Sequence, residues 1–275
     1  MKIGLQLFSV RDELVKDYMG TLEKVAAMGF EYVEFANHNA GKEFEAELPD
    51  PVELKKHLDR LGLKVICSHL CDSDIDGFID YNLKIGSSGI VMPMAFFNSK
   101  EQTIAYAKEL NAIGKKCADA GLNFYYHNHF QEFEKFEGET VMEILINNTS
   151  PEYVNFELDT YWTQRGGVNP VEYLQEIGDR CKIVHQKDIN KSLAPEDVNI
   201  LDHVEGEITM DTVLPVMKPE NFTEIGTGTM DIKAIVNQVN QMDSVEYIIV
   251  EVDMSTLPSL ESVEISLKNL KKIMA

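Results

Sequence analysis

Four strand-like segments in the second half of the chain each end in a side chain that can bind a metal ion. They span residues 124–127, 154–159, 182–185 and 247–251, and polar, loop-like sequence follows each of them. Two imidazoles and two carboxylates therefore stand at four successive strand ends. Because parallel barrels carry their chemistry at the carboxyl ends of their strands, the pattern predicts a metal-dependent enzyme built on such a barrel.

The predicted metal ligands are His127, Asp159, His185 and Glu251. Their mixed nitrogen and oxygen donors suit one divalent ion of Mn, Zn, Co or Fe, with Mg also considered, better than Ca²⁺, which prefers oxygen ligands alone. For any single one of these residues, a hydrogen-bonded polar group at the mouth of a barrel is the simpler interpretation. The order and the strand-end position of all four together favour the metal site.

Neighbouring side chains strengthen this prediction, because residues i and i+2 of a strand share one face. Each strand end thus brings further polar residues to the side of its ligand. The sets that share a face are Tyr125, His127 and His129; Glu157 and Asp159; His185 and Lys187; and Glu251 and Asp253.

The elements that must position these residues alternate between strand-like and helix-like sequence. Strands are expected at residues 3–8, 32–35, 63–69, 89–92, 122–127, 153–158, 181–185 and 247–252. Helices are expected at residues 21–28, 51–61, 75–85, 103–120, 140–147, 170–177, 231–242 and 260–273, with Asp231 as an N-cap. Eight strand–helix units predict a single α/β domain, one (β/α)8 TIM barrel over residues 1–275. An open doubly wound sheet is the alternative, but no Gly-rich phosphate fingerprint follows the first strand.

Two segments depart from this regular alternation. Residues 190–224 form a long loop after the seventh strand, with a short helix expected near residues 210–217. Long loops in compact domains are usually functional or mobile, and this one would lie at the face of the proposed site. Residues 226–231 could cradle an anion at a helix N-terminus, although a plain turn is the simpler interpretation.

The composition, with 44% hydrophobic and 26% charged residues, is that of a globular protein. No apolar run approaches the roughly 20 residues that cross a bilayer. Residues 1–5 begin in a strand pattern rather than a signal peptide, so a cytoplasmic protein is expected. The net charge of −21 disfavours nucleic acids and anionic membranes as partners.

The chain has four cysteines, which form no C-x-x-C pair: Cys67, Cys71, Cys117 and Cys181. They are expected to be buried or partly buried free thiols rather than zinc ligands.

Taken in order along the chain, several segments resemble the xylose isomerase-like barrel superfamily of sugar isomerases, epimerases and related dehydratases. The resemblance covers essentially the whole chain. It depends on residues 29–35 (GFEYVEF), 126–129 (YHNH), 158–162 (LDTYW), 185–188 (HQKD), 226–231 (GTGTMD) and 251–253 (EVD). In that superfamily Glu, Asp, His and Glu from strands five to eight usually bind the metal, which implies the four ligands named above.

One departure from the superfamily lies at strand five. His127 stands where epimerases of the superfamily usually carry a Glu, and a His-x-His at this strand is more similar to the branch that includes inosose dehydratases. Glu132, a few residues later, could supply the missing carboxylate as a base or as a ligand.

The resemblance implies an enzyme that acts on a small carbohydrate by enolisation, as a sugar isomerase or epimerase. The metal ion would polarise a carbonyl group, Glu251 or Glu132 would remove the adjacent proton, and Lys187 would stabilise the enediolate. Loss of a β-hydroxyl instead would give a keto-inositol or keto-sugar dehydratase, a lyase. A non-catalytic sugar-binding barrel is a further alternative, and a metal-dependent nuclease is disfavoured by the acidic charge.

Five further residues are predicted to contact the substrate, with a structural role as the alternative for each. Glu34 and His69 end strands two and three and could bind sugar hydroxyls, and His129 is a third candidate. Trp162, the only tryptophan, could stack on a sugar, and Arg11 could bind a carbonyl or acid group. A homo-oligomer is compatible with the sequence.

Overall fold

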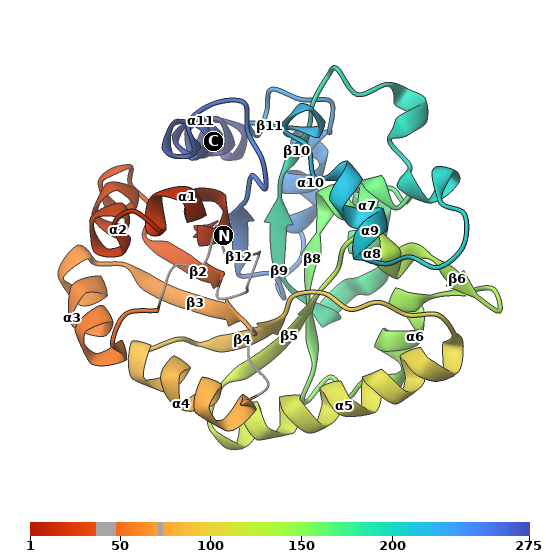
Figure 1. Cartoon of the computed structure of the whole chain (residues 1–275), viewed down its shortest axis with the longest axis horizontal. Coiled ribbons are helices and arrows are strands. Elements are labelled where there is room, and N and C mark those ends of the chain that lie inside the picture. The colour runs from red at the N-terminus through yellow and green to blue at the C-terminus, as the bar shows by residue number, and fades with distance from the viewer. Residues whose placement is uncertain (37–47, 71–73) are drawn as a thin grey trace.

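A closed barrel of eight parallel strands forms the centre of the molecule (Figure 1). The computed structural model describes residues 1–36, 48–70 and 74–275. In chain order the barrel strands are β1 (Lys2–Gln6), β2 (Tyr32–Ala36), β3 (Lys64–His69), β4 (Gly89–Met92), β5 (Asn123–His127), β8 (Asn155–Asp159), β9 (Cys181–Gln186) and β12 (Tyr247–Val250). They pair in the order β1-β12-β9-β8-β5-β4-β3-β2, so each strand lies beside its predecessor in the barrel and the last pairs with the first. This closure confirms the predicted (β/α)8 barrel.

Helices cover the outside of the barrel. They are α1 (Arg11–Leu14), α2 (Tyr18–Ala27), α3 (Pro51–Leu61), α4 (Ile75–Ile85), α5 (Lys100–Asp119), α6 (Val141–Asn148), α7 (Thr160–Arg165), α8 (Pro170–Ile177), α10 (Ile232–Val239) and α11 (Ser259–Met274), and a small hairpin of β6 (Lys135–Phe136) and β7 (Glu139–Thr140) precedes α6. The last helix, α11, contacts both α1 and α10 and so closes the ring of helices (Figure 1). Within the described ranges, no helix combines the length and the apolar composition needed to span a membrane.

Side-chain caps explain where several helices begin. The carboxylate of Asp231 accepts a hydrogen bond from the Ala234 backbone at 2.9 Å, which confirms the predicted N-cap of α10. Thr140 and Glu143 form a reciprocal capping box at the start of α6. These caps are local signals, so the starts of α6 and α10 lie within one residue of the positions expected from the sequence.

The first strand is shorter than expected. A strand is predicted over residues 3–8, but β1 ends at Gln6 and a 3-10 helix spans Leu7–Val10. The side-chain oxygen of Gln6 accepts a hydrogen bond from the Phe8 backbone at 3.1 Å, and this bond stabilises the turn of the chain. The helical region that follows is divided into α1 and α2, with Asp17 capping α2.

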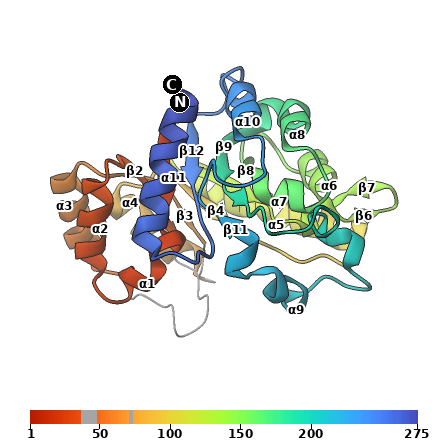
Figure 2. The ribbon, with the colours of Figure 1, turned by 90° about the horizontal axis from the view of Figure 1, so that it is seen from above.

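The long loop after β9 is held together at its base. β10 (Asp188–Ile189) pairs antiparallel with β11 (Phe222–Thr223), a pairing that the sequence pattern does not predict. Between them α9 (Met210–Val213) falls within the segment where a short helix is expected. α9 lies at the side of the molecule opposite the two chain termini (Figure 2). The buried guanidinium of Arg165 donates a hydrogen bond to the Val198 carbonyl at 2.9 Å, which attaches the loop to α7.

Three of the four cysteines have the predicted character. Cys67, Cys117 and Cys181 are buried free thiols. Cys71 lies outside the described residues, so the Cys67–Cys71 spacing has no structural counterpart to compare.

The interior of the barrel changes from apolar to polar toward the carboxyl ends of the strands. On β9 and just beyond it, buried side chains two residues apart are Ile183, His185 and Lys187. On β12 the corresponding side chains are Ile249 and Glu251. Because inward positions repeat every two residues, the apolar side chains form one layer inside the barrel, and the polar side chains form the next layer toward the carboxyl ends of the strands. We call this the polar layer; its members, all buried, are Gln6, Glu34, His69, His127, Glu157, Asp159, His185, Lys187, Glu251 and Asp253.

Candidate metal-binding active site

The four predicted metal ligands lie together at the carboxyl ends of four barrel strands. One ligand atom each from His127, Asp159, His185 and Glu251 can be chosen so that all four atoms lie within 4.8 Å of one another. His127 Nε2 lies 3.8 Å from Asp159 Oδ2, and His185 Nδ1 lies 2.7 Å from Glu251 Oε2. Buried nitrogen and oxygen donors at this spacing form a set that can hold a cation.

Lys187 lies against the carboxylates of the same set. Its ammonium nitrogen is 2.9 Å from Asp159 Oδ2, 3.0 Å from Glu251 Oε2 and 3.0 Å from Asp253 Oδ1. Burial lowers the pKa of the lysine, but these three carboxylates outweigh it and raise the pKa well above its usual value. Lys187 is therefore a fixed positive charge in the site at neutral pH.

Beneath the predicted ligands lies Glu157, which the sequence pattern places on the face of Asp159 without assigning it a role. Its Oε1 lies 3.0 Å from His127 Nδ1 and 3.0 Å from His185 Nε2. The one signal for it in the sequence is its position on β8 two residues before Asp159, which places both carboxylates on the inward face.

Glu34 and His69, predicted to contact substrate, belong to this lower group as well. His69 Nε2 lies 2.5 Å from Glu34 Oε1, and Gln6 donates to the same oxygen at 2.7 Å. Glu34 Oε2 lies 2.9 Å from His185 Nε2. Burial lowers the pKa of His69, but Glu34 and Glu157 outweigh it and raise the pKa to about 9. In this structure the side chains of Glu34 and His69 thus interact with other members of the polar layer.

The polar layer contains more negative charge than its one lysine can balance. Its buried carboxylates are Glu34, Glu157, Asp159, Glu251 and Asp253. Because an unpaired buried carboxylate is strongly unfavourable, protons or a metal ion must supply the missing positive charge. Protons supply part of it: despite burial, the surrounding carboxylates raise the pKa of His185 well above its usual value, and burial raises the pKa of Asp253 to about 7. A divalent cation among the same donors would balance the remaining excess.

Glu132, predicted as an alternative base or ligand, is not brought to the ligand set. Its carboxylate accepts hydrogen bonds from the Tyr126 hydroxyl at 2.6 Å and from the His129 backbone at 2.8 Å. Tyr126 precedes His127 on β5 and so points to the opposite face of the strand. Burial raises the pKa of Glu132 to about 7. In this position the carboxyl group stabilises the loop after β5.

The aromatic and cationic residues predicted to contact substrate surround the polar layer. Trp162 is fully buried, His129 stacks on it with ring centroids 5.2 Å apart, and Lys187 Nζ lies 5.2 Å from the Trp162 ring centroid. Trp162 therefore supports its neighbours and presents no exposed face to a sugar in this structure, whereas His129 is only partly buried. Arg11 donates a hydrogen bond to the Phe8 carbonyl at 2.7 Å.

The segment predicted to cradle an anion, residues 226–231, already binds a carboxylate of the chain itself. Asp188 accepts hydrogen bonds from the backbones of Gly226 and Gly228 at 2.9 Å each, and from Met230 at 3.1 Å. A Cβ atom at Gly228 would lie 2.3 Å from Asp188 Oδ1, so the turn requires glycine there. This segment is thus a structural turn, and its backbone donors are occupied.

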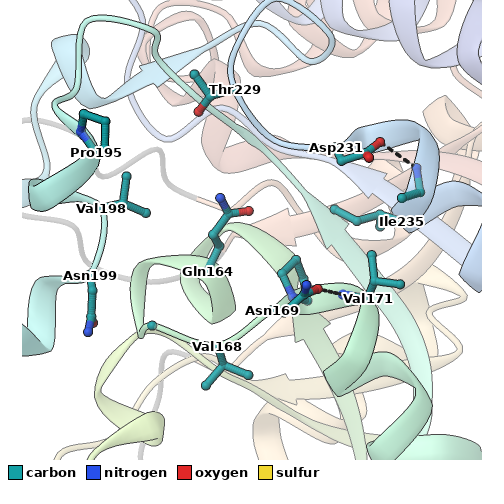
Figure 3. Close-up of a pocket in the computed structure, with 13 residues that line it drawn as sticks. Gln164, Val168, Asn169, Val171, Pro195, Val198, Asn199, Thr229, Asp231 and Ile235 are labelled. Carbon is teal, nitrogen blue, oxygen red and sulfur yellow. Dashed lines mark hydrogen bonds between the residues drawn. The ribbon is translucent and has the colours of Figure 1, made fainter.

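A groove on the described surface lies apart from the polar layer (Figure 3). Residues 164–171, 195–199 and 229–235 contribute its walls, and no member of the polar layer lines it. Asn169 and Asp231 on its rim cap their own helices through the hydrogen bonds drawn in Figure 3. The groove therefore adds no chemical group to the candidate site.

Comparison with known sequences identifies a family and several relatives of this chain. A protein-family model described as a xylose isomerase-like TIM barrel matches residues 22–273. The inosose dehydratase of Clostridium beijerinckii is 25% identical over 219 residues, which cover 80% of this chain and 67% of that protein. An inosose dehydratase of Clostridium botulinum is 27% identical over 201 residues, which cover 73% of this chain and 61% of that protein. The chain thus spans about two thirds of the length of these curated relatives, or slightly less.

Solved structures share the fold at lower identity. A sugar phosphate isomerase/epimerase from Parabacteroides distasonis superposes with a TM-score of 0.75 at 23% identity, covering 100% of this chain and 95% of the other. The IOLI protein with a binding zinc atom superposes with a TM-score of 0.74 at 14% identity, covering 100% and 98% of the two chains. At this level of identity, both likenesses establish the fold.

Proposed function

Because the chain belongs to the xylose isomerase-like TIM barrel family, we propose that it is a metal-dependent enzyme that removes the proton beside the carbonyl of a sugar-like ketone and then eliminates a neighbouring hydroxyl as water. The observation that carries the proposal is the convergence of two imidazoles and two carboxylates within 4.8 Å in the buried polar layer. The relatives named inosose dehydratase support elimination as the second step. Isomerisation or epimerisation, the reaction first expected from the sequence, shares the proton removal and is the alternative outcome.

The donor set fits a divalent cation of the Mn, Zn, Co, Fe or Mg type. His127, Asp159, His185 and Glu251 would hold it, and the two carboxylates supply negative charge that the protein itself leaves in excess. A bound cation would polarise the substrate carbonyl and so make the neighbouring C–H bond more acidic. The zinc atom in the IOLI protein supports a metal of this class in the same fold.

Glu251 is the proposed base. Burial raises its pKa, but Lys187 and His185 outweigh burial and hold the pKa well below its usual range, so the group is ionised at neutral pH, as a base must be. Lys187 places a positive charge 3.0 Å from Glu251, where it stabilises negative charge that develops on the substrate. Asp253 lies 3.0 Å from the same ammonium, and burial raises its pKa to about 7, so this carboxyl group can carry the proton that the departing hydroxyl takes. His129, partly exposed, is the proposed substrate contact.

Metal content tests the ligand assignment. Purified and reconstituted protein should hold about one equivalent of a divalent metal, and His185→Ala and Asp159→Ala should each abolish tight binding. Asp119→Ala is a suitable control, because Asp119 is exposed and pairs only with exposed Lys115 among its described neighbours. Full metal occupancy in both ligand variants would show the assignment to be wrong.

The reaction is tested with a keto-inositol in D₂O. The metal-loaded protein should exchange the proton next to the carbonyl for deuterium and release a product lighter by one water. Glu251→Gln should lose the exchange by at least about 100-fold, the lower end for general acid–base catalysis. Exchange with an inverted centre and no loss of water would select the epimerase alternative. Substrate binding without exchange would indicate a sugar-binding barrel.

The imidazole of His127 bears on the substrate class. Compared with a carboxylate, it leaves the metal site less negative and removes one of two facing bases, which favours single-base chemistry over two-base inversion. Keto-inositols or keto-sugar glycosides should therefore be better substrates than free ketoses such as fructose or tagatose. Epimerisation of free ketohexoses with kcat/KM near 10⁴ M⁻¹s⁻¹, roughly the lower end for ordinary enzymes, would contradict this assignment.

A further inference from the structure

We infer that Glu157 is a positioning residue that orients both metal-binding histidines from below, and that it forces the two rings into opposite tautomers. The inference rests on the proposed metal site. It goes beyond that proposal because it assigns a role to a side chain outside the ligand set and fixes which nitrogen of each ring faces the metal.

His127 directs its two nitrogens to different carboxylates. Its Nδ1 lies 3.0 Å from Glu157 Oε1, which is an ordinary N–H···O hydrogen-bond distance. Its Nε2 lies 3.8 Å from Asp159 Oδ2, an atom of the ligand set. A neutral imidazole carries its proton on one nitrogen and binds a metal through the other. His127 is therefore a ligand through Nε2, with its Nδ1 proton donated to Glu157.

His185 is turned the other way. Its Nδ1 lies 2.7 Å from Glu251 Oε2, on the side of the ligand set. Its Nε2 lies 3.0 Å from Glu157 Oε1 and 2.9 Å from Glu34 Oε2. His185 is therefore a ligand through Nδ1, with its proton on Nε2.

Glu157 is the side chain that links the two rings. One oxygen, Oε1, lies within hydrogen-bond distance of both His127 and His185, whereas Glu34 contacts only His185 of the two ligands among the described contacts. Glu34 is also engaged by Gln6 and His69. Carboxylates that accept the second N–H of a ligand histidine fix its orientation and raise its basicity, and their loss typically weakens metal binding by about 10–100-fold.

The lower group could itself be considered as a cation site, because His69, His127, Glu157 and His185 also bring ligand atoms within 4.8 Å of one another. Both groups, however, use the same two imidazoles. A ring that bound a metal through each nitrogen would have to lose both of its protons. One group therefore holds the cation, and the other holds the protons that orient the rings. The upper set of four contains two carboxylates, whereas the set of His69, His127, Glu157 and His185 contains one. Glu34 beside that lower set is already engaged by Gln6 and His69, so the cation belongs to the upper set.

The tautomers can be observed directly in the diamagnetic zinc-loaded protein with ¹⁵N-labelled histidine. Long-range proton–nitrogen correlation spectra should show His127 protonated at Nδ1 and His185 protonated at Nε2. The same tautomer at both rings, or the reverse assignment, would overturn the inference. Two equivalents of tightly bound metal would overturn it as well.

The role of Glu157 is tested by Glu157→Gln, which keeps the size of the side chain and removes its charge. Affinity for Co²⁺, measured by competition with a chelator, should fall by about 10–100-fold, and the visible spectrum of the bound cobalt should shift. Glu132→Gln is the matched control, because Glu132 is equally buried and hydrogen-bonded but lies outside the ligand set. Its cobalt affinity should stay within about threefold of wild type.

The outcomes separate this inference from the proposed function. If wild-type protein binds no divalent metal, the proposed function fails. If wild type binds metal and Glu157→Gln binds it equally well, the positioning role fails. If Glu157→Gln does not fold, Glu157→Asp keeps the carboxylate but withdraws it from the rings and should still weaken cobalt binding; unchanged affinity in that variant would also overturn the role.

Discussion

Replacing Lys187 by methionine tests whether the buried carboxylates depend on their internal cation. Methionine keeps an unbranched side chain of similar length but carries no charge. In metal-free protein the change removes an ammonium that lies 2.9–3.0 Å from oxygens of Asp159, Glu251 and Asp253. Removing one partner of a buried ion pair destabilises a protein by about 3–5 kcal/mol, because a charge is left uncompensated.

The expected change in melting temperature follows from the length of the chain. At roughly 2.1 cal/mol/K per residue, 275 residues unfold with an entropy of about 0.6 kcal/mol/K. A loss of about 3–5 kcal/mol therefore lowers the Tm by about 5–9 °C. We expect this drop at pH 8 in the absence of metal, and a smaller one with zinc bound, because the cation supplies positive charge to the same carboxylates.

The effect should depend on pH with a definite sign. Burial raises the pKa of Asp253 to about 7, above the value of about 4 expected for an unfolded chain. A carboxyl group shifted in this direction contributes stability below pH about 4 that is lost as the pH rises through about 7. Loss of Lys187 removes a charge that lowers the pKa of Asp253, and so raises that pKa further. The variant should therefore lose more stability than wild type between pH 5 and pH 8.

Thermal unfolding of metal-free and zinc-loaded protein at the two pH values measures these differences. Lys116→Met is the control, because Lys116 forms an exposed ion pair with Asp76 at 2.8 Å and should contribute less than about 1 kcal/mol. The reasoning is refuted if metal-free Lys187→Met melts within about 2 °C of wild type at pH 8, equivalent to about 1 kcal/mol.

Three further changes probe the scaffold. In Gly114→Ala, the new Cβ would lie 2.3 Å from the Tyr153 carbonyl oxygen, so we expect destabilisation of about 1–3 kcal/mol in chemical denaturation. Wild-type stability would contradict this close approach of α5 to Tyr153. Asp188→Ala leaves the buried backbone N–H of Met230 and the partly buried ones of Gly226 and Gly228 without their acceptor, so the protein should lose about 1–3 kcal/mol and residues 225–230 should exchange their amide protons faster. Unchanged protection there would contradict the role assigned to Asp188. Glu132→Gln removes a carboxyl group whose pKa burial raises to about 7. Between pH 5 and pH 8 wild type should therefore lose on the order of 1–3 kcal/mol more stability than the variant, measured by thermal unfolding of both proteins. Parallel pH profiles of the two proteins would exclude this shift.

The fold and the convergence of the four predicted ligand residues could be predicted because their signals are local. Each barrel strand is a short apolar run bounded by turn residues, and Asp231 and Pro51 mark helix starts through caps and ring geometry. His127 and His185 could be placed because each is at or near the carboxyl end of a strand, and a parallel barrel brings such ends together.

Other parts of the site depend on contacts that no local pattern contains. The partners of Glu157 come from strands up to 90 residues away, through the register and rotation of the closed barrel. Glu132 is directed to the opposite face of β5 by its bond to Tyr126, which a count of carboxylates near the strand does not reveal. The bond from Gly228 to Asp188 spans 40 residues, so the turn around Gly228 resembles an anion site in the sequence until its own carboxylate is located.

The pairing of β10 with β11 has a consequence for how much the loop after β9 can vary in length. The long excursion leaves the barrel at Asp188–Ile189 and returns at Phe222–Thr223, and these ends are paired with each other directly beyond Lys187. A segment whose ends are joined in this way behaves as a closed loop, for which doubling the length costs only about 0.6 kcal/mol of closure entropy. Insertions at exposed positions between residues 190 and 221 are then thermodynamically inexpensive, whereas replacing the whole segment would also remove the buried side chains of Ile200, Ile208 and Val213. Exposed positions of the excursion are therefore suited to the insertion of new recognition sequences, while the residues of the candidate site at the ends of β9 and β12 keep their positions.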